Sequence, residues 1–171
     1  MRSVKSEVVK KTIEKIKANF AEEILNIEEY SKQTFVSVKP QKIVAILKLL
    51  RDDSELSYDY LQDICGLDYM NQGMPERFAV VYNLYSYKNS SHFRIKAFVP
   101  EEEPEIDSVA SLWAAADWAE RETFDMYGIL FKNHPNLIRI LLPELYQGYP
   151  LRKDYPLRGR GERANFPKDT L

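Results

Sequence analysis

The chain has 171 residues, with 24 Lys and Arg against 26 Asp and Glu, and a formal net charge of −2. This length suits one domain, and 44% hydrophobic with 29% charged residues is typical of a globular protein with a buried core, not of a disordered or fibrous chain. The single cysteine, Cys65, excludes an internal disulfide and favours a reducing compartment, and it excludes a self-contained iron–sulfur cluster, which takes about four cysteine ligands.

The first part of the chain predicts helices that alternate with strands. Apolar residues at helical spacing over 9–20 predict an amphipathic first helix. The alternation over 34–39 predicts a strand, and Pro40 suits the first turn of a second helix that ends at the polar run 51–54. The apolar, aromatic stretch 58–67 is interpreted in part as a further strand.

A β-hairpin is the clearest local prediction. Residues 78–85 and 93–99 alternate as two strands, and 88–91 form the turn between them. The first strand is apolar on both faces, which is typical of a central strand. The hairpin ends at Pro100, and the acidic run 101–107 is predicted to be a polar loop.

A third helix is predicted to begin with Ser108 as N-cap and to end near Tyr127, where Gly128 terminates it. Glu120 lies on the same stripe of this helix as Val109 and other apolar residues. A carboxylate on an apolar face needs a partner, so we expect Glu120 to be hydrogen-bonded.

Asp117, Arg121 and Asp125 follow one another at intervals of four residues on a neighbouring face. This order suits helical ion pairs, so the set is either a catalytic acid–base cluster or a structural or interfacial salt-bridge network. No histidine or hydroxyl nucleophile stands beside it in sequence, which favours the network.

The last part of the chain, 129–171, is rich in proline yet too apolar and aromatic for a free linker. We therefore expect it to lie on another surface, either its own domain or a partner. The part from about Pro143 to Leu171 is expected to be mobile in the isolated chain and ordered in the complex. The predicted organisation is an α+β core domain over 1–128, a two-layer sandwich of a small mixed β-sheet with helices, followed by an extended partner-binding tail over 129–171.

No cofactor or metal site is predicted in this chain. The glycines of 159–164 imitate a dinucleotide fingerprint but lack the strand and helix that it needs. His134 before Pro135 has no metal-ligand spacing to Cys65 and is interpreted as a structural residue. The basic, tyrosine-rich tail suits either nucleic acid or a protein partner, and the acidic balance of the whole chain favours the protein.

Three stretches in one order, 120–128, 134–141 and 148–156, resemble the 30 kDa subunit family, the C subunits of proton-translocating NADH–quinone oxidoreductase (complex I). The strong resemblance covers about residues 108–160. Ile138 departs from it, because the family usually has a basic residue there, which leaves Arg139 to act alone.

The resemblance implies a non-redox structural subunit of the peripheral, hydrophilic arm, which supports electron transfer from NADH through Fe-S clusters to quinone. It implies partners in the quinone-site (D) subunit and in the cluster-bearing (B and I) subunits, with the Fe-S clusters, FMN and quinone held by partner subunits. It also implies a location on the cytoplasmic side of the inner membrane, with membrane contact only through the complex. Relatives that use ferredoxin, deazaflavin or hydrogen have similar subunits, so the donor stays open. The alternative is a free-standing nucleic-acid-binding module.

No catalytic residue is predicted here. The residues predicted to form the partner interface are Glu120, Arg121, Asp125, His134, Arg139, Tyr149, Arg152, Lys153, Asp154 and Tyr155.

Overall fold

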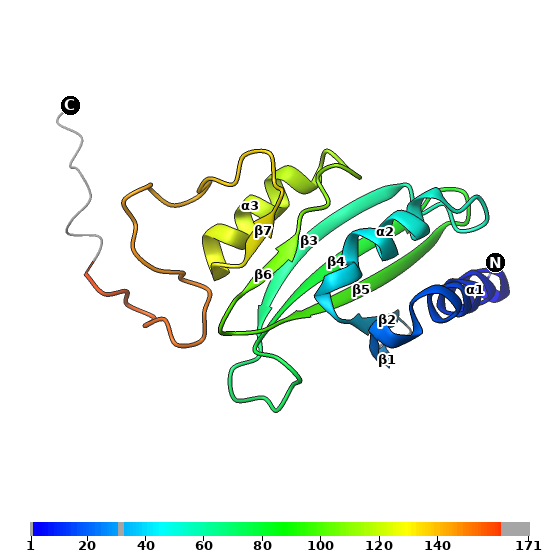
Figure 1. Cartoon of the computed structure of the whole chain (residues 1–171), viewed down its shortest axis with the longest axis horizontal. Helices are drawn as coiled ribbons and strands as arrows, with labels where there is room; N and C mark the ends of the chain where they lie inside the picture. The colour runs from blue at the N-terminus through cyan, green and yellow to red at the C-terminus, as the bar shows by residue number, and fades with distance from the viewer. Residues whose placement is uncertain (1, 31–32, 162–171) are drawn as a thin grey trace.

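The computed structural model describes residues 2–30 and 33–161. The last ten residues of the predicted tail, 162–171, therefore lie outside the described part. A five-stranded sheet, three α-helices and a small two-stranded sheet make up the fold of the described residues (Figure 1). The helices are α1 (Arg2–Phe20), α2 (Ile43–Asp52) and α3 (Ala116–Tyr127), with 3-10 turns η1 (Ala21–Glu23) and η2 (Pro40–Lys42).

The large sheet has the strand order β1-β2-β5-β4-β3. Strand β2 runs parallel to β5, and the other neighbours are antiparallel, so the sheet is mixed as predicted. Its strands are β1 (Ile24–Tyr30), β2 (Gln33–Val38), β3 (Tyr60–Asp68), β4 (Phe78–Ser86) and β5 (Ser91–Val99). The predicted α+β sandwich is confirmed, and β4 is an interior strand with both faces largely buried.

The helices pack on one face of this sheet and share one core with it. Alternate residues of the strands, such as Val36, Tyr82 and Ile95, are fully buried in one cluster with Ile16 of α1 and Ile46 of α2. Figure 1 shows α2 lying across the sheet and α1 beside β1 and β2. The predicted apolar stripe of α2 is confirmed as its buried face.

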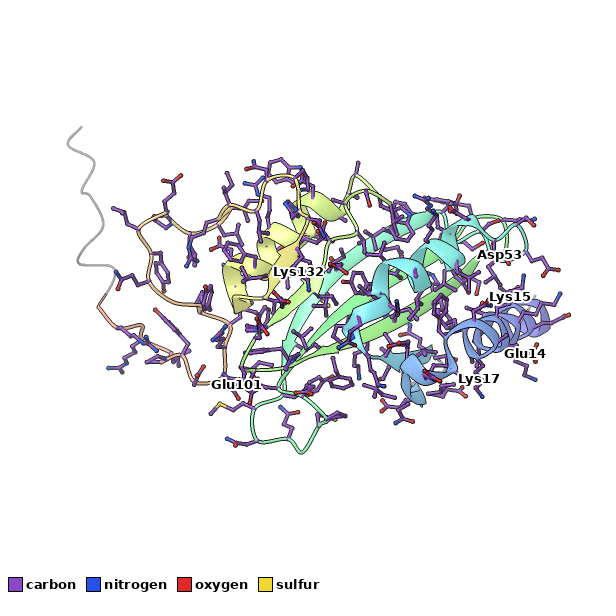
Figure 2. The ribbon with its side chains drawn as sticks, viewed as in Figure 1. Glu14, Lys15, Lys17, Asp53, Glu101 and Lys132 are labelled. Carbon is purple, nitrogen blue, oxygen red and sulfur yellow. The ribbon has the colours of Figure 1, made fainter. Side chains whose placement is uncertain are left out.

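Helix α1 is held to the loop after α2 by ion pairs. Lys15 Nζ lies 2.6 Å from Asp53 Oδ2 and 2.7 Å from Glu55 Oε2 (Figure 2). The Thr12 hydroxyl lies 3.2 Å from the Tyr58 hydroxyl inside the core. The amphipathic first helix is thus a packed element of the domain.

Strand β1 was not predicted. It pairs with β2 from Ile24↔Val38 to Tyr30↔Gln33, at the edge of the sheet. Its sequence mixes two isoleucines with Glu28 and Glu29, so it has too few alternating apolar residues to signal a strand. Backbone pairing with β2 holds this strand in the sheet, although its side-chain pattern does not predict a strand.

The third helix begins eight residues later than predicted, at Ala116. The Ser108 hydroxyl does not cap it, because it donates to the side chain of Glu120, and Val109 N–H donates to the same carboxylate. Residues 109–115 form turns instead, in which Trp113 N–H donates to Val109 O at 3.1 Å. The predicted apolar stripe is nevertheless buried.

The first residues of the predicted tail form a strand. A second, two-stranded sheet joins β6 (Glu105–Asp107), inside the predicted polar loop, to β7 (Leu130–Lys132), inside the predicted tail. Ile129 and Phe131 are 0% and 2% exposed and belong to the core. We use "tail segment" below for residues 133–161, which contain no helix or strand.

Among the described residues, no helix combines the length and apolar character that crossing a bilayer requires.

Candidate partner interface

The tail segment caps the C-terminal end of α3. The backbone N–H of Leu151 donates to Met126 O at 3.1 Å, and Arg152 Nε donates to Tyr127 O at 2.6 Å. The last carbonyls of a helix have no partner within it, and a cation near them is favoured by the helix dipole. The segment around Arg152 therefore contacts its own domain in this structure, and the mobility of the isolated tail stays a prediction that limited proteolysis would test.

Asp125 is the most heavily bonded side chain of the interface. Its Oδ1 pairs with Arg139 Nη1 at 2.6 Å, and its Oδ2 accepts the backbone N–H groups of 140–142 at 2.8–3.1 Å. Burial by itself raises the pKa of the Asp125 carboxyl, but these donors outweigh it and hold the pKa below its usual value. Asp125 thus pairs with the tail segment, and not along α3 with Arg121 as the spacing suggested.

A second anchor joins the tail segment to the end of β3. Arg77 is held by three carboxylates: it bonds to Asp68 at 3.0 Å, to Asp154 at 2.9 Å and to Glu101, and its side chain is 8% exposed. Asp68 Oδ2 also accepts the backbone N–H of Lys153 at 2.8 Å. Burial raises the pKa of Asp68 by itself, yet the Arg77 guanidinium and the backbone donors bring it below its usual value.

Guanidinium groups and aromatic rings alternate between the two anchors. Arg77 and Arg152 lie 4.8 and 4.9 Å from the ring of Phe78. Tyr149 lies between Arg152 at 4.5 Å and Arg139 at 5.3 Å. Such contacts contribute roughly 0.5–1 kcal/mol each where they are exposed. The guanidinium groups of Arg139 and Arg152, which were predicted to reach a partner, therefore contact rings of the chain itself.

Gly128 makes this seating possible. It ends α3 at φ +72°, and a Cβ there would lie 2.5 Å from the Tyr149 ring and 2.7 Å from Arg152. The helix end needs both a left-handed conformation and space for the tail segment.

Gly128→Ala is expected to destabilise the isolated chain. A left-handed backbone conformation alone costs a residue with a Cβ roughly 1–2 kcal/mol, and we expect a larger loss here. The extra cost comes from moving the Tyr149 ring. Gly73→Ala is the matched control, because Gly73 has φ +67° with no atom within 4 Å of a Cβ. Urea unfolding of both variants tests this, and equal losses would contradict the close approach of the tail segment.

Glu120 and His134 form a buried polar cluster where the tail segment begins. The Glu120 carboxylate is 0% exposed and accepts from the Ser108 hydroxyl and from Val109 N–H at 2.7 Å. His134 Nε2 lies 3.1 Å from Asp117 O and 3.8 Å from Glu120 Oε2. Burial, with a smaller contribution from Asp117, raises the pKa of Glu120 to about 7 against those two hydrogen bonds.

The outward side of this region is apolar. Trp118 of α3 is 62% exposed and lies under the Arg121 guanidinium at 4.9 Å, while Arg121 donates to the carbonyl of Ile138. Leucine and isoleucine side chains of the tail segment extend the apolar area: Ile138, Leu141, Leu145, Leu151 and Leu157, from 48% to 104% exposed. We call these five residues with Trp118 the apolar ridge.

The structure brings the ten predicted interface residues to one region, around α3 and the tail segment. Tyr149, Tyr155 and the charged residues of the set contact the chain's own atoms, with Tyr146 beside Tyr155. Asp68 and Arg77 were missed, because they precede their partners Lys153 and Asp154 by 85 and 77 residues and nothing in the local sequence links them. The only sequence signal for the apolar ridge was the high leucine content of a proline-rich stretch.

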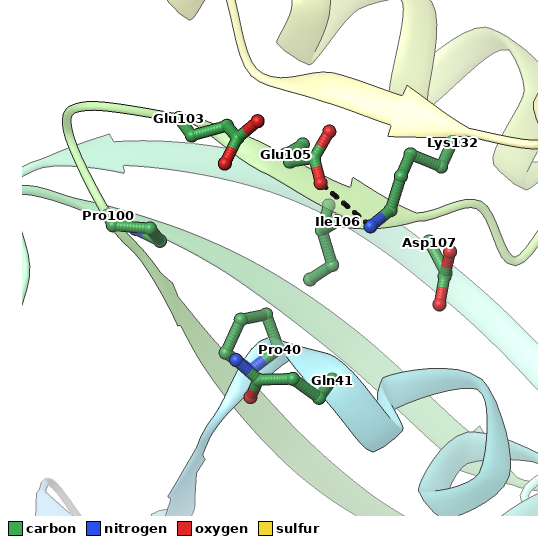
Figure 3. Close-up of a pocket in the computed structure, with 8 residues that line it drawn as sticks. All are labelled: Pro40, Gln41, Pro100, Glu103, Glu105, Ile106, Asp107 and Lys132. Carbon is green, nitrogen blue, oxygen red and sulfur yellow. Dashed lines mark hydrogen bonds and ion pairs between the residues drawn. The ribbon is translucent and has the colours of Figure 1, made fainter.

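A pocket opens beside β6 and η2. Lys132 Nζ donates to Glu105 Oε1 at 2.8 Å across it (Figure 3). It is lined by Pro40, Gln41, Pro100, Glu103, Glu105, Ile106, Asp107 and Lys132. Within 2–30 and 33–161, no group of three or more His, Cys, Asp or Glu side chains is placed to hold a metal ion.

Comparison with protein families assigns most of the chain. Residues 36–161 match the family described as respiratory-chain NADH dehydrogenase, 30 Kd subunit. This range covers most of the large sheet from β2 onward, all of α3 and the tail segment to its last described residue.

Curated relatives have the same assignment over nearly their whole length. The NADH-quinone oxidoreductase C subunit of Citrifermentans bemidjiense is 48% identical over 87% of this chain and 90% of its own. The protein of the same name from Roseiflexus sp. strain RS-1 is 42% identical over 93% of this chain and 90% of its own.

Solved structures have the same fold. A trypsin-resistant fragment of Nqo5 matches with a TM-score of 0.66 and 32% identity, over 76% of this chain and 99% of the fragment. A chain of a membrane-bound sulfane sulfur reductase, an archaeal respiratory membrane complex, matches with a TM-score of 0.69 over 97% of this chain and 94% of its own. Its identity is 20%, so this second likeness concerns the fold alone.

Proposed function

The chain belongs to the 30 kDa subunit family of respiratory-chain NADH dehydrogenase, and on this premise we propose that it is a non-redox structural subunit of the peripheral arm of that complex. It supports the passage of electrons from NADH through Fe-S clusters to quinone by holding neighbouring subunits in place. The clusters, FMN and quinone belong to those subunits, and this chain contributes no catalytic residue.

The observation that carries the proposal is the apolar ridge. Leu145 is 83% exposed and Leu157 fully exposed, on a segment whose polar side is bonded to α3 and β3. Large apolar side chains that are exposed along one stretch of chain are the kind of surface that a protein–protein interface covers. A segment already seated on its own domain also has less conformational entropy to lose when a partner binds.

We propose the quinone-site (D) subunit as the main partner of the ridge, with the cluster-bearing (B and I) subunits nearby. The charged residues of the predicted interface act mainly by shaping the tail segment. Arg139, Arg152 and Asp154 hold it against the domain, and the ridge beside them meets the partner. The complex places the chain at the cytoplasmic side of the inner membrane.

The nucleic-acid alternative gains no support from the interface. Arg139 is paired with buried Asp125, and Arg152 donates to a helix carbonyl and stacks on two rings. Phosphate binding would need these guanidinium groups to be available.

Leu145→Glu tests the proposal. The side chain is 83% exposed in the isolated chain, so the melting temperature of the chain is expected to change little. Incorporation into the complex is expected to fall at least tenfold, because a carboxylate would be buried at an apolar contact. Native gels of membranes from cells that express the variant measure this. Leu25→Glu, on edge strand β1 at 40% exposure, is the control and should assemble normally. Normal assembly of Leu145→Glu would exclude the ridge as the interface.

A further inference from the structure

His134 is held in place by two hydrogen bonds. Its Nδ1 accepts the backbone N–H of Asn136 at 3.0 Å. Its Nε2 lies 3.1 Å from the carbonyl oxygen of Asp117, to which it donates. These two bonds fix the orientation of the imidazole between α3 and the turn 134–136.

The carboxylate of Glu120 is buried without a cation. Within the described residues, the sole basic group inside 4.0 Å of it is the imidazole of His134, at 3.8 Å. Its other neighbours are the Ser108 hydroxyl and the Val109 N–H. Two neutral donors do not fully offset the removal of a charge from water.

The groups that face this cluster from other elements also disfavour a negative charge. Asp117 Oδ1, on α3 itself, lies 3.4 Å from His134 Nε2 and is buried without a hydrogen bond. Tyr82 of β4 is fully buried with its hydroxyl unbonded, and Asp107 of β6 is close enough to influence it. No cation of β4, β6 or the turn 134–136 pairs with Glu120 among the described residues.

We propose that Glu120, with His134 beside it at 3.8 Å, is a buried proton-binding site that couples the seating of the start of the tail segment to protonation. A proton from solvent binds to the Glu120 carboxylate and turns it from an acceptor of two hydrogen bonds into a neutral acid. Ser108 Oγ already accepts from Ala110 N–H at 3.1 Å and is next to the new O–H. The protonated form removes the buried charge beside Asp117 and stabilises the contact of 134–136 with α3.

The sign of the effect follows from the direction of the pKa shift. Burial raises the pKa of Glu120 from 4.5 to about 7, so between these values the folded chain holds a proton that the unfolded chain has lost. The contribution of Glu120 to stability is therefore complete below about pH 4.5 and is lost as the pH rises through about 7.

NMR titration of the full chain from about pH 5 to 9 tests the proposal. The Val109 amide donates to Glu120, and its proton resonance should shift with a midpoint near pH 7. The resonances of the His134 ring, which lies 3.8 Å from Glu120, should move with the same midpoint because they report the charge of that carboxyl group. His92, which is exposed on β5, is the internal reference for the ring signals. If the Val109 amide resonance of the unmodified chain shows no transition between about pH 6 and 8, the proposal is overturned.

Glu120→Gln imitates the protonated acid, and Glu122→Gln, an exposed residue of the same helix, is the matched control. The shared midpoint should vanish in Glu120→Gln and persist in Glu122→Gln. The melting temperatures of Glu120→Gln and the unmodified chain should be close at about pH 5 and diverge at about pH 8.5, where the unmodified chain melts lower. A transition that persists in Glu120→Gln, or a difference in melting temperature that does not change with pH, would assign the titration to another group.

Discussion

Asp125→Ala is expected to destabilise the isolated chain by about 3 kcal/mol, because it removes the fully buried member of an ion pair and leaves the part-buried Arg139 without its partner. Arg139 loses its ion pair at 2.6 Å, and the three N–H groups of 140–142 lose their acceptor. An unbonded buried backbone donor costs roughly 1–3 kcal/mol, so relaxation of the tail segment into water limits the total loss. Urea unfolding monitored by tyrosine and tryptophan fluorescence gives the free energy.

Two comparisons separate the charge of Asp125 from its position. Glu122→Ala, exposed on the same helix, should change the free energy of unfolding by less than about 0.5 kcal/mol. Because the pKa of Asp125 is below its usual value, its contribution is present above the unfolded value of 3.8 and is lost as the pH falls through the folded value. Asp125→Asn should therefore lessen the acid sensitivity of the chain. A loss in Asp125→Ala as small as that in Glu122→Ala would contradict the anchored tail segment.

Arg77→Ala is expected to have an effect of similar size, about 3–5 kcal/mol, since it leaves the fully buried side chain of Asp68 as an unpaired charge. It also frees Asp154, so the peptide bonds after Arg152 and Lys153 should become more sensitive to trypsin. Limited proteolysis with mass spectrometry locates the cuts, and urea unfolding measures the loss.

Glu101→Ala is the control for Arg77, because it removes the most exposed of the three carboxylates, at 57%. Its expected loss is that of a surface ion pair, about 0–1 kcal/mol. Unchanged trypsin sensitivity of Arg77→Ala at the tail segment would show that the ion pair to Asp154 does not hold it.

Hydrophobic periodicity was sufficient to predict most of the core. The apolar stripe of α2 and the alternating apolar residues of β2, β4 and β5 are clear sequence signals, because each element buries one or both faces against the same core. Strand β1 was missed because an edge strand needs little apolar pattern when backbone pairing holds it. Strands β6 and β7 have three residues each, and this is too short for a period to show.

The geometry of the predicted interface residues could not be derived from the sequence. The motifs around Glu120, Asp125 and Arg152 were identified through resemblance to a family. Resemblance does not show whether a charged side chain of the tail contacts its own domain or a partner. That choice depends on Asp68 and Arg77, which the fold brings to Lys153 and Asp154 from a distant part of the chain. Spacing along α3 predicted an ion pair of Arg121 with Asp125, and a long-range partner, Arg139, replaced it.

The proposal that this chain is a structural subunit without redox chemistry is tested most directly by activity per assembled complex. Membranes from cells that express Leu145→Glu are compared with unmodified membranes for NADH–quinone reductase rate, normalised to the complex present on native gels. We expect the total rate to fall with the amount of complex and the rate per complex to stay near normal. Fully assembled complexes with little activity would contradict the account, because they would assign this chain a part in the reaction itself.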